Sequence, residues 1–392
     1  MKGNTPLAPP RAERLLELVD AFHGQPVAMV VDLVVDRFIH GTARRISREA
    51  PVLILRHDGE VNVPGGGANA VANVAALGGR PVPLGVVGDD EPGRCLLELL
   101  GATGVEVGGI AVRPGYRTPT KTRIVAGGRH AAKQQLVRYD IEDTLVPTTD
   151  DDERLLDAVT RHAADARAVV LSDYGYGVVH PGLVDALRAR LPTVPLLGDS
   201  RYRLHDFSGL DGATPNLEEA EKALGGGVGR LEDEALEPGG EALRRRLGLP
   251  FLLVTRGSAG MSLFTAGAAW HLPVHGTDQV ADVTGAGDTV IGTFALASAA
   301  GANPLEAACL ANYAGGLVVM KQGTATLAPG ELRDAVRRGA GLLDRIEGGP
   351  VDGGPPRNGA ATADDSGDRD LGDRESGDRD LGDRDLGDRD DG

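Results

Sequence analysis

The sequence has few cysteines, few aromatic residues and no long apolar run, and each shortage excludes a class of protein. Cys95 and Cys309 are far apart in the 392-residue chain, which excludes a disulfide framework and a cysteine-rich metal cluster. Both have apolar neighbours in sequence, so we expect buried structural thiols. Aromatic residues make up only 3%, so the core must be built from Ala, Val and Leu. No apolar run approaches the roughly 18 residues that a membrane span needs.

Acidic residues outnumber basic ones. The chain has 57 Asp and Glu against 41 Lys and Arg, a net charge of −16 and a pI near 5.0. This balance argues against nucleic acid or an anionic membrane as a partner, so an anionic substrate must meet a local basic pocket. The first 20 residues lack the apolar segment of a secretory signal, and we therefore expect a cytoplasmic protein.

Composition divides the chain into an N-terminal helical extension (1–24), a body (25–345) and an acidic Gly-Asp-Arg tail (346–392). Residues 366–390 repeat a five-residue unit such as LGDRD. A unit with at most one apolar residue cannot bury enough surface to offset its ordering entropy, so we expect a disordered tail. A calcium-binding repeat is the alternative, but the known one is a nonapeptide with paired glycines, and arginines repel a cation.

The body alternates strand-like and helix-like stretches. An alanine-rich helix is expected at 65–79, and short apolar runs end at polar or glycine residues in 26–36, 81–90, 166–177, 194–200 and 250–260. This alternation predicts an α/β fold, with a mostly parallel sheet covered by helices on both faces. Ligands bind beyond the carboxyl ends of such strands, where the following residues fall: Asp32, Asp89, Asp173, Asp199 and Thr255.

Two segments depart from this pattern. Residues 37–63 and 116–140 are rich in β-forming and turn residues and lack helical periodicity. They predict a small separate β-sheet that covers the site as a lid. Ordinary edge strands of the main sheet are the alternative.

The stretch DVTGAGDTVIGTF, residues 282–294, places a glycine turn before an apolar helix. The free N–H groups of Gly285, Ala286 and Gly287, together with the helix dipole, would bind an anion. Asp288 in the first turn is placed to accept a proton from an attacking hydroxyl during phosphoryl transfer. The alternative is that Asp288 only favours the helix start electrostatically, and this stretch alone does not decide between them.

Two stretches in this order, PGGGANAVANVAALGG (64–79) and DVTGAGDTVIGTF, resemble the two signatures of the ribokinase-like (PfkB-type) carbohydrate kinases. Between them, TPNLEEAE (214–221) is similar to the family's Asn-x-x-Glu motif, and LLVTRGSAGMSLF (252–264) to its strand and turn beside the nucleotide. The resemblance covers about residues 25–335. It implies a ribokinase-like sheet of nine or so strands with a β lid, and transfer of the ATP γ-phosphate to a sugar hydroxyl.

The resemblance also implies roles for single residues. Asp288 would be the general base, beside an anion hole formed by the amides of Gly285, Ala286 and Gly287. Glu219, with Asn216, would organise the Mg²⁺ shell and the phosphates, and the nucleotide would lie along Thr255, Gly257 and Asn312. Asp282 and Thr284 would contribute to a monovalent-cation site, with K⁺ as the candidate ion. The sugar hydroxyls would be held by Asp32, Gly65, Gly66 and Asn69.

Within the family, the heptose-phosphate kinase branch is the most similar, through VVDLVVDRFIHGTARRISREAPV, TKTRIV, QQLVRYD, VLSDYG and NYAGGLVVMKQGTATLAPGEL. That branch phosphorylates O1 of D-glycero-D-manno-heptose 7-phosphate. A basic cluster in the lid would clamp the remote phosphate, with solvated strand faces as the alternative: Arg45, Lys121, Arg123, Lys133 and Arg138. The sequence departs from the branch at Val31, Tyr176 and Ser200–Arg201, where glycine, lysine and Pro-Lys are usual, so the exact sugar stays open.

Two further functions are kept as alternatives. The first is a kinase of the same fold for another sugar or sugar phosphate. The second is a catalytically silent sugar- or nucleotide-binding regulator, against which Asp288, the anion hole and the Asn216–Glu219 pair argue. For partners, we expect a sugar phosphate, ATP and a second copy of the chain, bound through the lid as a homodimer, with no nucleic acid and no membrane.

Overall fold

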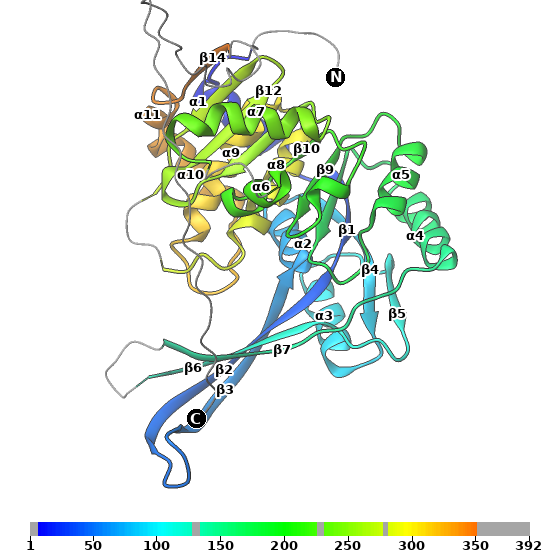
Figure 1. The fold of residues 1–392 in the computed structure, drawn as a ribbon, viewed down its shortest axis with the longest axis vertical. Coiled ribbons are helices and arrows are strands. Elements are labelled where there is room, and N and C mark those ends of the chain that lie inside the picture. The colour runs from blue at the N-terminus through cyan, green and yellow to red at the C-terminus, as the bar shows by residue number, and fades with distance from the viewer. Residues whose placement is uncertain (1–6, 128–133, 226–230, 277–280, 351–392) are drawn as a thin grey trace, which may run out of the picture. The chain divides into compact units, whose positions relative to one another are not determined.

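The structure, a computed structural model, describes residues 7–127, 134–225, 231–276 and 281–350. Its main sheet has ten strands in the order β14-β13-β12-β11-β10-β9-β8-β1-β4-β5 (Figure 1). The parallel strands are β1 (Pro26–Val31), β4 (Arg80–Gly88), β5 (Ile110–Arg113), β8 (Ala168–Asp173), β9 (Leu196–Ser200), β10 (Gly212–Ala213) and β11 (Phe251–Thr255). Three antiparallel strands complete one edge: β12 (Met261–Thr265), β13 (Ala268–Leu272) and β14 (Glu347–Pro350). The predicted mostly parallel sheet is confirmed.

Helices cover both faces of this sheet, as predicted. One face carries α1 (Ala12–Asp20), α2 (Gly67–Ala76), α3 (Glu91–Ala102), α8 (Ala286–Ala299), α9 (Pro304–Val318), α10 (Pro329–Arg338) and α11 (Ala340–Leu343). The other face carries α4 (Thr149–His162), α5 (Pro181–Arg190), α6 (Leu217–Leu224) and α7 (Leu236–Arg246). Side chains alternate along a strand, so Met29 of β1 packs into the first core while Val30 packs into the second. Short 3₁₀ turns lie at Leu204–Asp206, Asp233–Ala235 and Gly257–Ala259.

A second sheet projects from the body and forms the predicted lid (Figure 1). Its order is β3-β2-β6-β7, with β2 (Leu33–Ile46), β3 (Leu53–Gly66), β6 (Thr120–Gly127) and β7 (Gln134–Ile141). The alternative of edge strands in the main sheet is therefore wrong. The lid strands run past the predicted bounds because β2 follows β1 with only Asp32 between them, and β3 leads directly into α2.

Several boundaries need correction. The N-terminal segment is part of the core, because Leu15 and Leu18 of α1 are buried. The body also extends beyond residue 345, because Glu347–Pro350 form β14 and pair with β13. Cys309 is buried as expected, but Cys95 is only half-buried. The predicted tail beyond residue 350 and Lys133 lie outside the described residues. In the described ranges, no helix is long and apolar enough to cross a membrane.

Candidate active site

A cavity of about 550 Å³ lies where the lid meets the carboxyl ends of the central strands. The lid contributes Asp36 of β2 together with Lys121, Arg123 and Arg138. The main sheet contributes residues at or just after the ends of β8, β9 and β11, and the amino ends of α6 and α8 complete the wall. Most of the predicted site residues therefore come together, although in sequence they range from Gly66 to Asp288.

Asp288 lies at the cavity, in the first turn of α8, and only 3% of it is exposed. Its carboxylate accepts hydrogen bonds from Asn69 Nδ2 at 3.1 Å and from the Tyr174 hydroxyl at 2.8 Å. Burial raises the pKa of Asp288 to about 7, against the opposing effect of those two hydrogen bonds. A carboxylate with such a pKa is suited to accept a proton near neutral pH, a property that helix capping does not require.

The glycine turn before α8 has the shape that an anion site needs. Gly285 has φ +79°, in the left-handed region, and a Cβ there would lie 2.4 Å from Asn69 Nδ2. Gly285 and Gly287 line the cavity, whereas Ala286 does not. The Ala286 amide donates to the Val283 carbonyl oxygen at 3.2 Å, because the first turn of the helix is tightened. In this structure, therefore, the Ala286 amide is engaged rather than free for an anion.

The Asn-x-x-Glu motif forms a capping box at the start of α6. Asn216 N donates to Glu219 Oε2 at 2.9 Å, and Glu219 N donates to Asn216 Oδ1 at 2.9 Å. Both side chains line the cavity, together with Thr255 at the end of β11. The motif thus fixes the helix start and presents the Glu219 carboxylate to the cavity.

Two residues predicted to lie along the nucleotide are not in the cavity wall. Asn312 of α9 is buried, and its amide donates to the Pro273 carbonyl oxygen at 2.7 Å. Gly257 begins the 3₁₀ turn after β11, with φ +55° and open space around it. A role for either residue in nucleotide binding stays a prediction.

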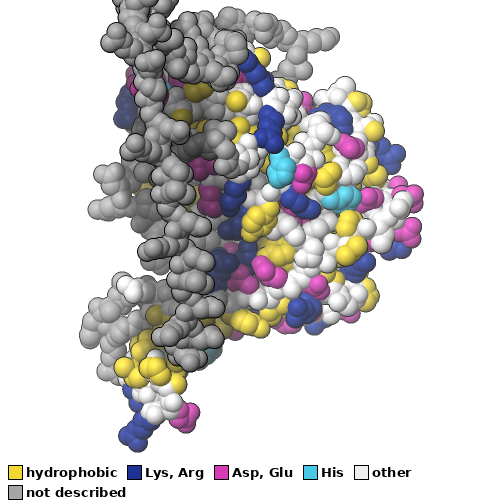
Figure 2. All heavy atoms as spheres, in the orientation of Figure 1, with side chains coloured by type: hydrophobic (Ala, Val, Ile, Leu, Met, Phe, Trp, Pro, Cys, Tyr) yellow, Lys and Arg dark blue, Asp and Glu magenta, His cyan; other side chains and the backbone are white. Residues whose placement is uncertain are grey.

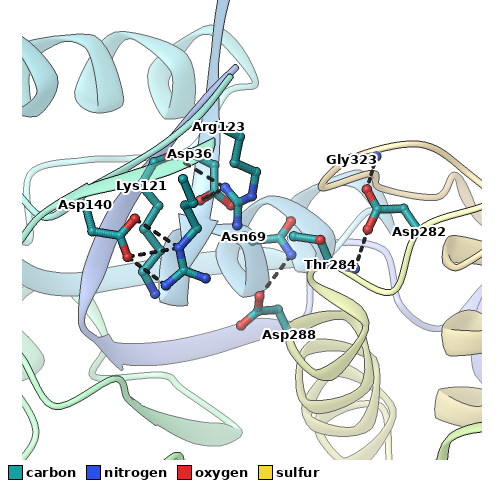
Figure 3. A network of polar contacts seen from close by, with 10 residues as sticks. Asp36, Asn69, Lys121, Arg123, Asp140, Asp282, Thr284, Asp288 and Gly323 are labelled. Carbon is teal, nitrogen blue, oxygen red and sulfur yellow. Dashed lines mark hydrogen bonds and ion pairs between the residues drawn. The ribbon is translucent and has the colours of Figure 1, made fainter. Parts of the chain in front are cut away.

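The lid cations differ in their partners, as Figure 3 shows. Arg123 NH1 donates to Asp36 Oδ1 at 2.6 Å, and Arg138 forms an ion pair with Asp140 at 2.7 Å. Lys121 is 8% exposed, and its ammonium nitrogen lies 5.2 Å from the centre of the Tyr174 ring. Arg45 is exposed near the far end of β2 and does not line the cavity, so a role for it in the clamp stays a prediction.

Asp32 and Asn69 are not among the residues that line the cavity, and their contact with the sugar stays a prediction. The Asp32 carboxylate accepts hydrogen bonds from the amides of Tyr174, Tyr176 and Val178 at 2.8, 3.0 and 3.1 Å. Burial raises the pKa of Asp32 to about 6. Asn69 donates to Asp288 and, at 3.3 Å, to the Gly285 carbonyl oxygen. Both residues position other groups of the site.

Asp36 is a cavity residue that sequence reasoning missed. It is 3% exposed, and a Cβ on Gly65 would lie 2.7 Å from its Cγ, so Gly65 leaves room for this carboxylate. Gly66 lines the cavity and has φ +51°. The available signal was a second acid four residues after Asp32 in an otherwise apolar stretch.

The loop before the glycine turn is held by Asp282. Its carboxylate accepts hydrogen bonds from the amides of Thr284 at 2.9 Å and Gly323 at 3.1 Å (Figure 3). Burial opposes ionisation of Asp282, but these hydrogen bonds outweigh it and lower the pKa. Thr284 lines the cavity, and a monovalent-cation site at this loop stays a prediction.

Comparison with known proteins identifies the family. The profile of the pfkB family carbohydrate kinases matches residues 27–330. The chain belongs to the PfkB family of carbohydrate kinases. This membership confirms the family resemblance drawn from the two glycine-rich stretches.

Curated PfkB relatives include the bifunctional protein HldE of Mesorhizobium japonicum, 38% identical over 85% of this chain and 66% of that protein. The bifunctional protein HldE of Pseudomonas aeruginosa (strain LESB58) is 43% identical over 82% of this chain and 65% of that protein. The chain thus spans slightly less than two thirds of the length of these curated relatives.

Solved structures show the same ribokinase-like fold. The ribokinase of Arabidopsis thaliana complexed with ribose and ATP has a TM-score of 0.61 and 22% identity, covering 82% of this chain and 99% of that one. The phosphofructokinase-2 of Escherichia coli in complex with potassium has a TM-score of 0.63 and 17% identity, covering 82% of this chain and 100% of that one. At such low identity these two likenesses support the fold of this PfkB kinase and not its substrate.

Proposed function

We propose that this kinase transfers the γ-phosphoryl group of ATP to O1 of D-glycero-D-manno-heptose 7-phosphate. The observation that carries the proposal is Asp288, a buried carboxylate with a raised pKa that meets a cavity with a basic lid wall. The sequence resemblance to the heptose-phosphate kinases and the similarity to HldE proteins support this acceptor.

In the proposed reaction, Asp288 accepts the proton of the attacking sugar hydroxyl. Asn69 and Tyr174 hold its carboxylate in place. The Gly285–Gly287 turn at the amino end of α8 lies beside it, where the helix dipole and the Gly287 amide favour negative charge on the transferred group. These groups position the reactants and stabilise charge, which are the two demands of phosphoryl transfer.

Asp199 and Glu219 are the cavity residues that would hold Mg²⁺. Burial raises the pKa of each, and each carboxylate also lies in the field of other carboxylates. Such carboxylates favour a cation, and Mg²⁺ binds through one or two carboxylates plus substrate phosphates and water. When bound, Mg²⁺ would neutralise phosphate charge. The described residues contain no group of three or more His, Cys, Asp or Glu arranged to hold a metal by themselves.

A kinase for another sugar or sugar phosphate remains the first alternative. Tyr176 replaces the lysine usual in the heptose-phosphate kinases, and its hydroxyl donates to Glu142 Oε1 at 2.7 Å. A silent regulator is disfavoured, because a protein that only binds has no need of a base with a pKa near neutrality.

A coupled ADP-release assay over a panel of sugars and sugar phosphates tests the function. We expect the highest kcat/KM with D-glycero-D-manno-heptose 7-phosphate. Asp288→Asn should keep ATP affinity, measured by calorimetry, and should lower kcat by about 10²-fold or more, the range for loss of a general base. Faster phosphorylation of a different acceptor would reject the heptose assignment. Near-normal turnover by Asp288→Asn would reject the base.

We also propose a homodimer formed through the lid. The lid sheet has two edge strands, β3 and β7, and Figure 2 shows hydrophobic side chains on its projecting part. The exposed apolar side chains of the lid are Ile46, Val52, Leu53, Val61, Leu136, Val137 and Tyr139. Exposed apolar sheets of this kind are usually covered by a partner, and a second copy supplies the same surface.

A further inference from the structure

We propose that Lys121 and Arg201 form the subsite for a phosphate monoester in the candidate active site. The inference deepens the proposed function and rests on it for the identity of the acceptor. It replaces the Arg123–Arg138 clamp expected from the sequence, because those two arginines already have carboxylate partners.

The first observation is the burial of Lys121 without an ion pair. The residue is 8% exposed and lines the cavity, yet no carboxylate of the described residues lies within ion-pair distance of its ammonium group. Its nearest described contacts for that group are the rings of Tyr174 and Tyr176, with centres 5.2 and 5.8 Å away. A cation–π contact only partly replaces water around a buried ammonium, so the side chain is suited to bind an anion.

The second observation concerns the pairing of the basic side chains that line the cavity. We call Lys121, Arg123, Arg138 and Arg201 the basic wall of the cavity. Two carboxylates, Asp36 and Asp140, neutralise Arg123 and Arg138, which leaves two positive charges. Figure 3 shows Lys121 in the lid, between Asp140 and Asp36. A phosphate monoester carries about two negative charges near neutral pH and could pair with these two cations.

The third observation concerns Arg201, which lines the same cavity as Lys121. Arg201 follows β9, and its field is, after burial, the largest cause that lowers the pKa of Lys121. Among the described residues, Arg201 makes no ion pair; its guanidinium stacks on Tyr202 with 5.9 Å between guanidinium carbon and ring centre. Two neighbouring cations that repel each other are stabilised together by one anion between them.

Two sources could supply this phosphate: the acceptor's own phosphate, or the γ-phosphate of ATP. Lys121 belongs to β6 of the lid, whereas the charge of Arg201 also lowers the pKa of Glu219, a residue of the Asn-x-x-Glu motif. The chemistry of the subsite is the same in both cases, and kinetic constants separate the two.

The test uses Lys121→Met and Arg201→Met, each of which removes a charge and keeps most of the side-chain volume. Lys222→Met is the matched control, because Lys222 lines the same cavity but is paired with Glu218 at 2.7 Å. Inorganic phosphate is the first probe and requires no turnover. We expect it to raise the melting temperature of the wild type and the control, and to lose this effect in both variants.

Steady-state kinetics then identify the source. Loss of a charged hydrogen bond corresponds to about 10- to 150-fold in KM. A rise in KM for the phosphorylated acceptor alone assigns the subsite to the acceptor's phosphate. A rise in KM for ATP alone assigns it to the γ-phosphate of the nucleotide. In the first case, KM for the unphosphorylated sugar should change by about twofold or less.

Equal stabilisation of wild type and both variants by phosphate would overturn the proposal. If Lys121→Met fails to fold, as judged by circular dichroism, the exposed Arg201 provides the same test alone. The wild type could fail to phosphorylate heptose 7-phosphate while phosphate still raises its melting temperature and does not raise that of the two variants. In that case the proposed acceptor is wrong and the subsite stands. The kinetics are then repeated with the best acceptor of the panel.

Discussion

At the scale of single residues, the sequence motifs identify Asp288 but not all of the side chains that hold it in place. Asp288 was predictable from the glycine turn, and its position is as expected. Tyr174 was not assigned any role, although its hydroxyl is one of two donors to Asp288. No local pattern could show this contact, because it joins residues 114 positions apart and depends on how the loop after β8 turns.

The Tyr174 contact leads to a prediction on pH dependence. Asp288 must be ionised to accept a proton, and its pKa is about 7, so kcat should rise with pH through about 7 and then level off. The Tyr174 hydroxyl donates to the carboxylate and so stabilises the ionised form. Tyr174→Phe should therefore raise the pKa of Asp288 by about one unit, an effect of about 1.4 kcal/mol.

The expected loss in kcat is about tenfold below pH 6 and small above pH 9, where Asp288 is ionised in both proteins. The groups around Asp288 also include Asp36, whose charge raises its pKa, and Lys121, whose charge lowers it. Tyr202→Phe serves as the control, since Tyr202 lines the same cavity without a hydrogen bond to Asp288. A uniform loss at every pH would mean that Tyr174 only supports the fold.

At the scale of elements, the loop after β8 connects the lid with Asp288, the proposed general base. Asp32 holds three amides of this loop, Tyr174 reaches Asp288, and Tyr176 reaches Glu142 just after β7 of the lid. The family resemblance assigned Asp32 to the sugar, and its place at the carboxyl end of a strand was consistent with a ligand contact. Here the loop after β8 folds back over the strand end, and its amides occupy the Asp32 carboxylate. The spacing of residues in the sequence cannot reveal this.

The same loop predicts a specific result for Asp32→Asn. An amide side chain keeps only one acceptor oxygen for three donors, so at least one buried amide of the loop loses its partner. Leaving a buried group unpaired costs about 1–3 kcal/mol, and we expect a lower melting temperature together with a lower kcat.

KM for the acceptor should change little in Asp32→Asn, because Asp32 does not line the cavity. Calorimetric melting and steady-state kinetics check both expectations. A large rise in acceptor KM with unchanged stability would restore the sugar-binding role that the resemblance implies.

The lid gives a second prediction at this scale. Val137 of β7 is 52% exposed, and a charge there should oppose burial against a second copy. We expect Val137→Asp to shift a dimer to a monomer in light scattering after size exclusion. Val112→Asp is the control, because Val112 is 51% exposed on β5 and lies outside the lid. A wild type that is monomeric at high concentration, or a variant that stays dimeric, would reject the lid as the interface.

At the scale of the whole molecule, alternation of strands and helices was enough to predict a mostly parallel sheet with two covered faces. The antiparallel edge was not predictable in the same way. β14 has the sequence EGGP, which lacks β-forming residues, and it becomes a strand only because the exposed edge of β13 offers main-chain partners. The sequence boundary at residue 345 therefore left all of β14, which composition assigned to the tail, outside the body.

Two truncations test this corrected boundary. A chain that ends at Gly353 keeps β14, and we expect its kinase activity and melting temperature to equal those of the full chain, because the repeat has too few apolar residues to pack. A chain that ends at Arg345 loses β14 and also Ile346, which is 9% exposed in the core. Loss of a buried isoleucine costs about 2–5 kcal/mol, so this chain should melt several degrees lower. Differential scanning calorimetry of the three chains gives their melting temperatures. Equal melting temperatures for the two truncated chains would show that β14 contributes nothing to stability. A lower melting temperature for the chain ending at Gly353 than for the full chain would show that the tail packs on the body.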